Sequence, residues 1–417
     1  MRSFSNLPPV SPAGARHPSP VRAMAPIAMA LFFGFVSVGL PLPVVPLFVH
    51  QVLGYGDIVV GTTVGLQFLA TVLTRGHAGS VADAQGGKLS MMRGALTCSG
   101  AGALYVIASI LPFSPAVALS VLLVGRVLAG VGESQLVTGS VTWMIATGGS
   151  AYAGTAMSLT GMAMYASVAL SAPLGMVLYE HLGFPSAMTV IVIAPLLACA
   201  VGARTPSAFT TPGVRVPMSR VLGTIWRSGL GLLLQGVGFA VISAFASLFF
   251  ASRGWPHAAL AMTLFGGAYA LMRVCFGHLP DRMGGYLIAV ISLGVECAGQ
   301  AMLWLSPTET VALGGAFLSG MGCSLLFPAL GVEILKHIPA HSRGTALGGF
   351  VAFQDIAYGI TGPITGVLAA RAGYASVFLV GALSALAGIG FVLFERSRSH
   401  SHNRLTPSLP ERNPAHE

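Results

Sequence analysis

Three ionisable side chains, Arg126, Glu133 and Asp355, stand inside long apolar stretches of the sequence. A charged group is costly in a hydrocarbon environment, so a charge kept in such a stretch usually serves a function. On a helix, Arg126 and Glu133 would share one face about 10 Å apart along the axis, which is too far for a tight pair. A carboxyl group in a low-dielectric site can bind and release protons near neutral pH, and an arginine that moves would switch it. These residues predict a proton-binding site with Glu133 as the closer candidate and Asp355 as the alternative, while a buried structural ion pair is the competing interpretation.

Other residue types that support chemistry lack the spacing that the chemistry requires. No CxxC, HExxH or GxxxxGKS/T pattern occurs in the sequence. The cysteines all lie within apolar runs, so they are expected to be buried free thiols. The sequence therefore predicts no metal site, no ATP-driven motor and no cofactor. The five cysteines are Cys98, Cys199, Cys275, Cys297 and Cys323.

The composition indicates the kind of element that must position these groups. Apolar residues make up 54% of the 417 positions and charged residues only 8%, with 54 glycines. A typical soluble domain has roughly 25% charged residues. So few charges exclude an ordinary soluble enzyme, a disordered protein and a nucleic-acid binder. The net charge of +9 is expected to come from the loops of a membrane protein.

Apolar stretches long enough to span a bilayer as a helix, about 20 residues, recur along the whole chain. They predict an all-α membrane protein with twelve transmembrane helices. Pro41, Pro43 and Pro46 predict a kink in the first helix. The predicted helices are 25–49, 58–74, 89–111, 116–146, 156–179, 184–203, 229–251, 257–274, 286–305, 311–335, 346–370 and 375–394.

The distribution of Lys and Arg predicts the orientation in the membrane. An even number of helices places both termini on one side, and 18 of the 21 Lys and Arg fall in the loops and tails of that side. The exceptions are Arg126, Arg253 and Arg371. Cationic loops stay in the cytoplasm, so both termini are predicted to be cytoplasmic. The predicted organisation is a disordered cytoplasmic tail at 1–24, a six-helix bundle at 25–203, a cytoplasmic loop at 204–228, a second six-helix bundle at 229–394 and a cytoplasmic tail at 395–417.

The two halves of the chain repeat. Residues near the second predicted helix recur 198 positions later, and residues from the fourth helix onward recur 190 positions later. Glu133 and Asp355 break the repeat, because Cys323 and Tyr165 hold the matching positions. A duplicated six-helix unit is typical of alternating-access transporters. The repeated pairs are Arg75 and Arg273, Gly79 and Gly277, Asp83 and Asp281, Gly86 and Gly284, Gly87 and Gly285, Gly130 and Gly320, Gly132 and Gly322, Gly154 and Gly344, Thr155 and Thr345, and Pro173 and Pro363.

The loop segments at 79–88 and 277–285 carry the most specific pattern. Each has an aspartate followed by a glycine pair that permits a tight reversal at the membrane face. They resemble the loop signature G-x-L-x-D-R-x-G-R/K of the major facilitator superfamily, from which the first segment departs at Ala84. The resemblance covers nearly the whole chain and implies two six-helix bundles around a central cavity. The candidate gating-loop residues are Arg75, Gly79, Asp83, Gly86, Gly87, Arg273, Gly277, Asp281, Arg282 and Gly284.

Motifs within the helices resemble the same family. The R-x-x-x-G-x-G order that begins at Arg126 resembles the fourth-helix motif of members that couple solutes to protons. The resemblance implies Arg126, Glu133, Asp355 and Tyr165 as proton-coupling and substrate residues. Glu296 ranks below Asp355, because the ninth helix of this family is usually peripheral. The strings at 39–43 and 353–359 resemble the YhhS-type branch of bacterial permeases.

The fifth and eleventh predicted helices resemble the antiporter signature GPxxGG, in degenerate form. Close helix packing by glycine explains these positions about as well as an export function does. The candidate packing and kink residues are Gly130, Pro173, Gly175, Gly362, Pro363 and Gly366.

The resemblance implies secondary active transport of a small organic solute across the bacterial inner membrane by alternating access. Proton-coupled efflux by an antiporter is the first hypothesis, and an importer or uniporter of a small metabolite is the alternative. A transporter-like sensor and an intramembrane enzyme fit less well, because the tail after Phe394 is short and no histidine lies at mid-depth. The expected partners are the solute, protons and the lipid bilayer, without nucleic acid, and the expected state is a monomer. No short motif encodes the substrate.

Overall fold

The computed structural model describes residues 20–112, 114–149, 152–208, 218–336, 338 and 343–405, and the regular secondary structure of these residues is helical. No strand occurs in these residues. The elements are α1 (Pro20–Gly39), α2 (Pro41–Leu47), η1 (Phe48–Val52), α3 (Asp57–Gln85), α4 (Gly87–Ile110), α5 (Pro115–Gly148), α6 (Ala153–Leu182), α7 (Phe184–Arg204), α8 (Met218–Ser252), α9 (Ala258–Phe276), α10 (Leu279–Met283), α11 (Gly285–Leu305), α12 (Glu309–Lys336), α13 (Arg343–Ala372) and α14 (Ala375–Leu405).

Twelve long helical segments match the twelve predicted spans one to one, with α1, α2 and η1 together forming the first. This confirms the all-α fold class. Within the described residues, ten of the twelve are long and apolar enough by themselves to cross a membrane. The other two are α4 and α13, and several of their glycines pack against neighbouring helices.

Several helices extend beyond the predicted stretches. The first helix begins at Pro20, and α14 continues to Leu405. Residues 1–19, 209–217 and 406–417, which belong to the predicted tails and central loop, lie outside the described residues. The domain boundaries stay a prediction.

The first span is interrupted at Leu40. The helix α1 ends at Gly39, and α2 begins at Pro41, whose ring nitrogen has no N–H to donate to the preceding turn. A wider π-helical turn follows, and the Leu53 N–H donates to the Phe48 carbonyl at 3.0 Å. The proline-rich segment thus divides the span into two helices, at the position where the sequence predicts a kink.

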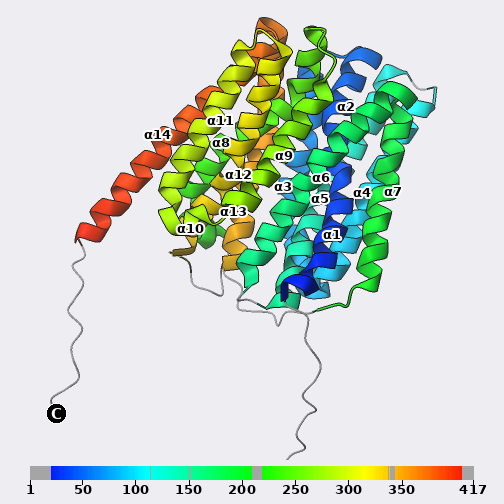
Figure 1. Cartoon of the computed structure of the whole chain (residues 1–417). Coiled ribbons are helices and arrows are strands. Elements are labelled where there is room, and N and C mark those ends of the chain that lie inside the picture. Colours follow the sequence, from blue (N-terminus) through cyan, green and yellow to red (C-terminus); the bar gives the residue numbers. More distant parts are fainter. Residues whose placement is uncertain are drawn as a thin grey trace, which may run out of the picture.

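The helices form two groups that follow the two halves of the chain (Figure 1). Helices α1 to α7 pack mainly on one another, and so do α8 to α14. The two groups meet where α3 packs on α13, where α6 packs on α9 and where α2 packs on α8. These are the two six-helix bundles of the predicted fold.

The internal repeat recurs in the backbone and in the packing. Gly86 and Gly284 both reverse the chain, with φ angles of 90° and 89° that favour glycine. Glycines at matching positions of the two halves also approach carbonyl groups at matching positions. Both the glycines and the residues that they contact are related by the offsets found in the sequence. These contacts are Gly130 on Gln67 in the first bundle and Gly320 on Phe265 in the second.

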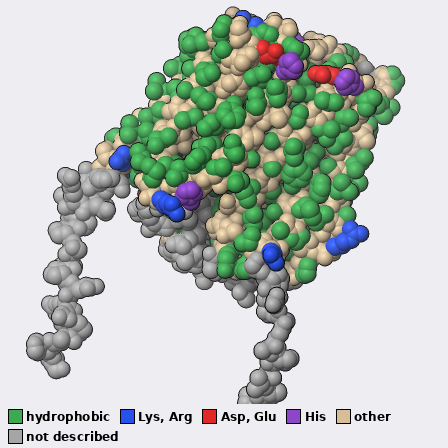
Figure 2. Space-filling model, in the orientation of Figure 1, with side chains coloured by type: hydrophobic (Ala, Val, Ile, Leu, Met, Phe, Trp, Pro, Cys, Tyr) green, Lys and Arg blue, Asp and Glu red, His purple; other side chains and the backbone are tan. Residues whose placement is uncertain are grey.

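The surface is that of a protein surrounded by lipid. Hydrophobic side chains cover the middle of the visible face, and Lys and Arg gather mostly along its lower rim (Figure 2). The start of α1 and the end of α14 lie on this lower side (Figure 1). We call this side the terminal face and the opposite side the distal face. The architecture is that of a multi-pass membrane protein.

Candidate functional site

The helices α3 and α13 form a close seam between the two bundles. Gly61 of α3 faces Gly362 of α13, backbone against backbone. A methyl group added to Gly366 would lie 2.6 Å from the Asp57 carbonyl oxygen. Small residues let helix backbones approach this closely. Both glycines of α13 belong to the predicted packing residues, and Pro363 lies between them against Gly65.

An ion pair joins the bundles further along this seam, towards the terminal face. The Arg75 Nη2 group of α3 donates to the Asp355 Oδ2 atom of α13. Their side chains are only 15% and 7% exposed. Removing one partner of such a buried pair leaves an uncompensated charge, which is strongly unfavourable. The two bundles are therefore held in this arrangement by charges that lie 280 positions apart in the chain.

Glu133 lies beside this ion pair on α5 and is 4% exposed. Its Oε2 atom accepts hydrogen bonds from Gln67 Nε2 at 2.8 Å and from Thr71 Oγ1 at 3.2 Å. The charges of Asp355 and Arg75 also act on it. The structure thus brings the two carboxyl groups that the sequence singles out into one electrostatic cluster, together with two neutral donors.

Arg126 is also buried, but it does not pair with Glu133. Its Nε and Nη2 groups donate to the Thr63 and Val64 carbonyl oxygens of α3, each at 3.0 Å. This arginine holds α5 against α3 within the first bundle. The arginine that faces a carboxylate of the cluster is Arg75, which the sequence assigns to a loop.

The second seam, between α6 and α9, repeats this arrangement with aromatic groups. Arg273, the repeat counterpart of Arg75, donates from Nη2 to the Tyr269 hydroxyl at 2.7 Å. Tyr269 stacks on Tyr165, the counterpart of Asp355, with ring centroids 3.5 Å apart. The Tyr165 hydroxyl lies 3.3 Å from that of Tyr358. One seam therefore carries an ion pair and the other a tyrosine stack.

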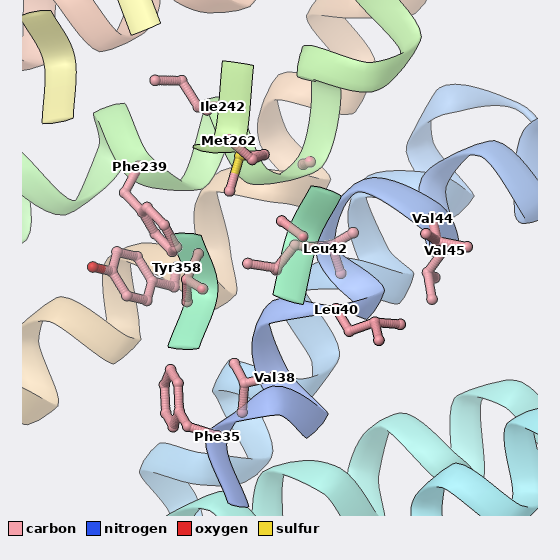
Figure 3. Packing of buried hydrophobic residues seen from close by; sticks show 14 of the residues in the cluster. Phe35, Val38, Leu40, Leu42, Val44, Val45, Phe239, Ile242, Met262 and Tyr358 are labelled. Carbon is pink, nitrogen blue, oxygen red and sulfur yellow. The ribbon is translucent and has the colours of Figure 1, made fainter. Parts of the chain in front are cut away.

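The distal half of the interface is closed by apolar side chains. Every residue from 34 to 49 in the first span and from 238 to 250 in α8 is buried. Phe35, Val38, Phe239 and Met262 point towards one another from both bundles around Tyr358 (Figure 3). A path through the centre of the protein to the distal face requires these side chains to separate.

A polar contact links the bundles at the distal face itself. The Tyr374 hydroxyl, between α13 and α14, donates to Asp57 Oδ1 at the start of α3 at 2.8 Å. Burial and the neighbouring Asp57 raise the pKa of Tyr374, so its hydroxyl keeps its proton. His50 Nδ1 lies 3.7 Å from the same carboxylate oxygen. The hydrogen bond between Tyr374 and Asp57 therefore links the two halves of the chain at the closed distal face.

The loop assignment of several predicted gating residues is wrong. The helix α3 continues to Gln85, so Arg75, Gly79 and Asp83 are helical, and only Gly86 separates α3 from α4. Asp83 is exposed on the last turns of α3. The apolar pattern ends near Arg75, but the helix continues because its backbone hydrogen bonds do not require apolar side chains.

In the second loop segment, too, residues predicted to lie in a loop belong to helices. Arg273 lies in the last turn of α9, Asp281 and Arg282 belong to the short helix α10, and Gly277 precedes it. Gly87 is the first residue of α4. The side chain of Asp281 lies outside the described part of the structure.

The remaining packing candidates lie on α6. Pro173 lies inside α6, and Gly175 faces Leu40 at the break of the first span. A methyl group on Gly175 would lie 2.8 Å from the Leu40 carbonyl oxygen. Because Gly175 has no side chain, the backbone of Leu40 can pack directly against α6.

Sequence patterns do not single out the neutral members of the site. Gln67 and Thr71 are hydrogen-bond donors to Glu133, and Tyr269 and Tyr358 form the aromatic seam. Neutral side chains do not stand out in an apolar helix as charged ones do. The one available signal is helical spacing, since Gln67, Thr71 and Arg75 are separated by four residues each and share one face of α3.

The described residues contain no group of three His, Cys, Asp or Glu side chains placed to hold a metal ion. The five cysteines are free thiols. The side chains described at the interface can bind protons, form ion pairs and make hydrogen bonds.

Two six-helix bundles that repeat each other within one chain are an architecture of membrane transporters. The sequence model of the Major Facilitator Superfamily matches residues 27–259 and 229–414. The chain belongs to this superfamily. Its family implies membrane transport of a small solute.

Relatives and solved structures agree with this assignment. An uncharacterized MFS-type transporter of Salmonella typhimurium is 45% identical over 366 residues, which cover 88% of this chain and 94% of that protein. One of Burkholderia pseudomallei is 39% identical over 371 residues, 88% of this chain and 90% of that protein.

The fold is shared with two solved transporters. The D-xylose-proton symporter has a TM-score of 0.73 at 16% identity and covers 89% of this chain and 96% of its own. The human organic anion transporter MFSD10 has a TM-score of 0.68 at 14% identity, with coverage of 90% and 100%. The YhhS-type branch stays a prediction.

Proposed function

We propose that the protein is a proton-coupled secondary transporter that exports a small organic solute across the bacterial inner membrane. The observation that carries the proposal is the buried Arg75–Asp355 ion pair between the bundles, with Glu133 beside it. In this proposal Arg126, Glu133, Asp355 and Tyr165 line or support the coupling site. The unit of function is expected to be a monomer.

The ion pair supplies a simple coupling step. A proton that binds Asp355 removes its charge, so the attraction to Arg75 is lost and α13 is no longer held against α3. Deprotonation restores the pair and favours the closed arrangement. A ligand that binds one arrangement more tightly shifts the equilibrium by its differential affinity. Proton binding and solute binding can in this way bias the same pair of arrangements.

Glu133 is the second carboxyl group of this proposal. Gln67 and Thr71 donate hydrogen bonds to its carboxylate, and the Asp355 charge acts on it. Two carboxylates in one low-dielectric cluster repel each other, so a proton on one favours ionisation of the other. Glu133 and Asp355 can then hold a proton in turn.

The alternative is an importer of a small metabolite that uses the same ion pair. The D-xylose-proton symporter has the same fold, so the fold does not select the direction of transport. Export is supported by the degenerate antiporter signature around Pro173 and Pro363.

A proton-flux experiment in inverted membrane vesicles tests the proposal. A respiration-driven proton gradient is followed with a pH-sensitive dye while a broad panel of small organic compounds is added. We expect at least one compound to dissipate the gradient in vesicles that contain the protein but not in vesicles with Asp355→Asn. If a transported compound moves without any proton flux, the protein is a uniporter or uses another ion.

The charge distribution predicts that the terminal face is cytoplasmic. Reporter domains fused between α7 and α8, and after α14, should both report the cytoplasm, because Lys and Arg concentrate on that side. A fusion at Gly373, in the turn between α13 and α14 on the distal face, is the control that should report the periplasm. A periplasmic signal from either terminal-face fusion would contradict the proposed orientation.

The seam between α6 and α9 offers a matched pair of substitutions. A methyl group on Gly266 would lie 2.8 Å from Ala169 Cβ across the seam, whereas one on the adjacent Gly267 would meet nothing within 4 Å. Gly266→Leu should force the bundles apart and reduce solute transport about fivefold or more, since overpacking costs about 1–3 kcal/mol. Gly267→Leu should transport normally, because its side chain would point into lipid. Equal transport by the two variants, at equal protein in the membrane, would show that this seam does not have to close.

A further inference from the structure

A second carboxyl group is buried in the other bundle, away from the cluster just described. Glu296 of α11 is 0% exposed. Glycines of two neighbouring helices make room for it: Gly238 of α8 lies against its carboxyl group, and Gly322 of α12 lies against its backbone and Cβ. The polar side chains beside it are Gln235 of α8 and Cys323 of α12.

This carboxyl group has no compensating cation. Among the described residues no Lys, Arg or His forms an ion pair with Glu296, and its carboxyl group interacts with the neutral side chains of Gln235 and Cys323 rather than with a cation. The other buried carboxylates differ, since Asp355 pairs with Arg75 and Glu333 accepts from the Gly285 N–H at 3.0 Å. An isolated carboxylate in a low-dielectric interior is far more costly than a neutral carboxylic acid. The closed arrangement therefore favours the form that carries a proton.

The titratable groups around Glu296 are few. On α12 the neighbour is Cys323, and on α11 itself it is Cys297. The helix α8 contributes the neutral Gln235, and Gln300 of α11 donates to the Gly238 carbonyl at 3.0 Å. The helix α14 approaches this region with Gly381, which lies against Gln300. No neighbouring charge of the described structure replaces the proton.

The internal repeat relates the surroundings of Glu296 to those of Glu133. At the offset of 198, Glu296 corresponds to Cys98, and at the offset of 190, Cys323 corresponds to Glu133. In the first bundle the Cys98 thiol lies against Gly132 and within electrostatic range of Glu133, and in the second the Cys323 thiol lies next to the Glu296 carboxyl group. Each bundle thus has one carboxyl group and one thiol on equivalent helices, with the two residue types exchanged.

We propose that Glu296 is a second proton-binding site, located in the C-terminal bundle and equivalent by the internal repeat to the Glu133 site. Its proton is retained while α8, α11 and α12 enclose the carboxyl group, and it leaves when these helices separate enough to admit water. The helix α8 also packs on α2 of the other bundle, so movement of the bundles acts directly on this enclosure. The existence of the site does not depend on export or on Asp355, whereas its use in a transport cycle rests on the proposed function.

Infrared difference spectroscopy of the purified protein in lipid, without solute, tests this site. Spectra recorded between about pH 5 and about pH 10 should contain the carbonyl stretching band of a protonated buried carboxyl group that disappears as pH rises. Glu296→Gln should remove this band and reduce the number of protons released over the same range by one. Glu133→Gln and Asp355→Asn should leave it in place, and Glu309→Gln, which alters a carboxylate near the distal face, is the matched control.

Two results would overturn the proposal. One is a wild-type spectrum that Glu296→Gln leaves unchanged. The other is a Glu296 band that persists through the whole pH range, since the group would then be a permanent hydrogen-bonding acid. Glu296→Asp keeps the carboxyl group and should restore a titrating band if Glu296→Gln alone folds poorly. A titrating Glu296 band together with solute transport that needs no protons would sustain this site while contradicting the proposed function.

Discussion

Asp355→Asn is expected to abolish gradient-driven transport while the protein remains in the membrane. The amide keeps the shape of the side chain but leaves the buried Arg75 without its counter-charge. Breaking a buried ion pair in this way costs about 3–5 kcal/mol. A cost of this size shifts the equilibrium between bundle arrangements by about two to four powers of ten. The measurement is solute accumulation in proteoliposomes under an imposed proton gradient.

Two further variants distinguish the loss of the charge pair from a general effect of substitution on the protein. The double exchange Arg75→Asp with Asp355→Arg restores opposite charges and should recover part of the transport that either single change removes. Glu395→Gln is the matched control, because Glu395 lies 3.8 Å from an Arg227 side chain that is 42% exposed. An exposed pair contributes about 0–1 kcal/mol, so this variant should transport normally. Normal transport by Asp355→Asn would remove the ion pair from the coupling mechanism.

Glu133→Gln is expected to uncouple transport from the proton gradient. The glutamine oxygen can still accept the hydrogen bonds from Gln67 and Thr71, so the local packing should persist. The side chain can no longer bind or release a proton. We expect exchange of solute across the membrane to continue, whereas accumulation driven by a proton gradient is lost and the pH profile of transport becomes flat.

The measurement compares solute exchange with gradient-driven accumulation in the same proteoliposomes. Glu180→Gln is the control, since Glu180 is an exposed residue near the end of α6 and should retain both activities. If Glu133→Gln keeps full accumulation and an unchanged pH profile, Glu133 is not the proton carrier, and Asp355 or another ion must be considered.

The helices of this protein follow from local sequence. Apolar stretches of bilayer length produce them, because backbone groups in lipid must bond within the helix itself. Reversals follow as well: Gly86 and Gly284 occupy positions with positive φ, which the glycine pairs of the two loop segments predict. The duplicated architecture is visible as residue pairs at two constant offsets. These features depend only on residues that are close in the chain or on direct comparison of its halves.

Which residues make up the proposed coupling site could be decided only by the tertiary structure. Asp355 and Glu133 stand out as charges in apolar helices, but their partners do not. Arg75 lies 280 positions before Asp355, and its apolar surroundings end so early that it reads as a loop residue. The angle and register at which α3 packs on α13 decide that this arginine, rather than Arg126, meets the carboxylate.

Glu296 is a second example of a residue whose surroundings only the tertiary structure reveals. The sequence places a carboxyl group in an apolar helix, and the family resemblance ranks it low. Only the packed structure shows that α8 and α12 enclose it without a cation. Hydropathy and helical period are local properties, so the sequence alone determines which segments span the membrane. Ion pairs and buried acids depend on which helix faces meet, and that is decided by the packing of the whole chain.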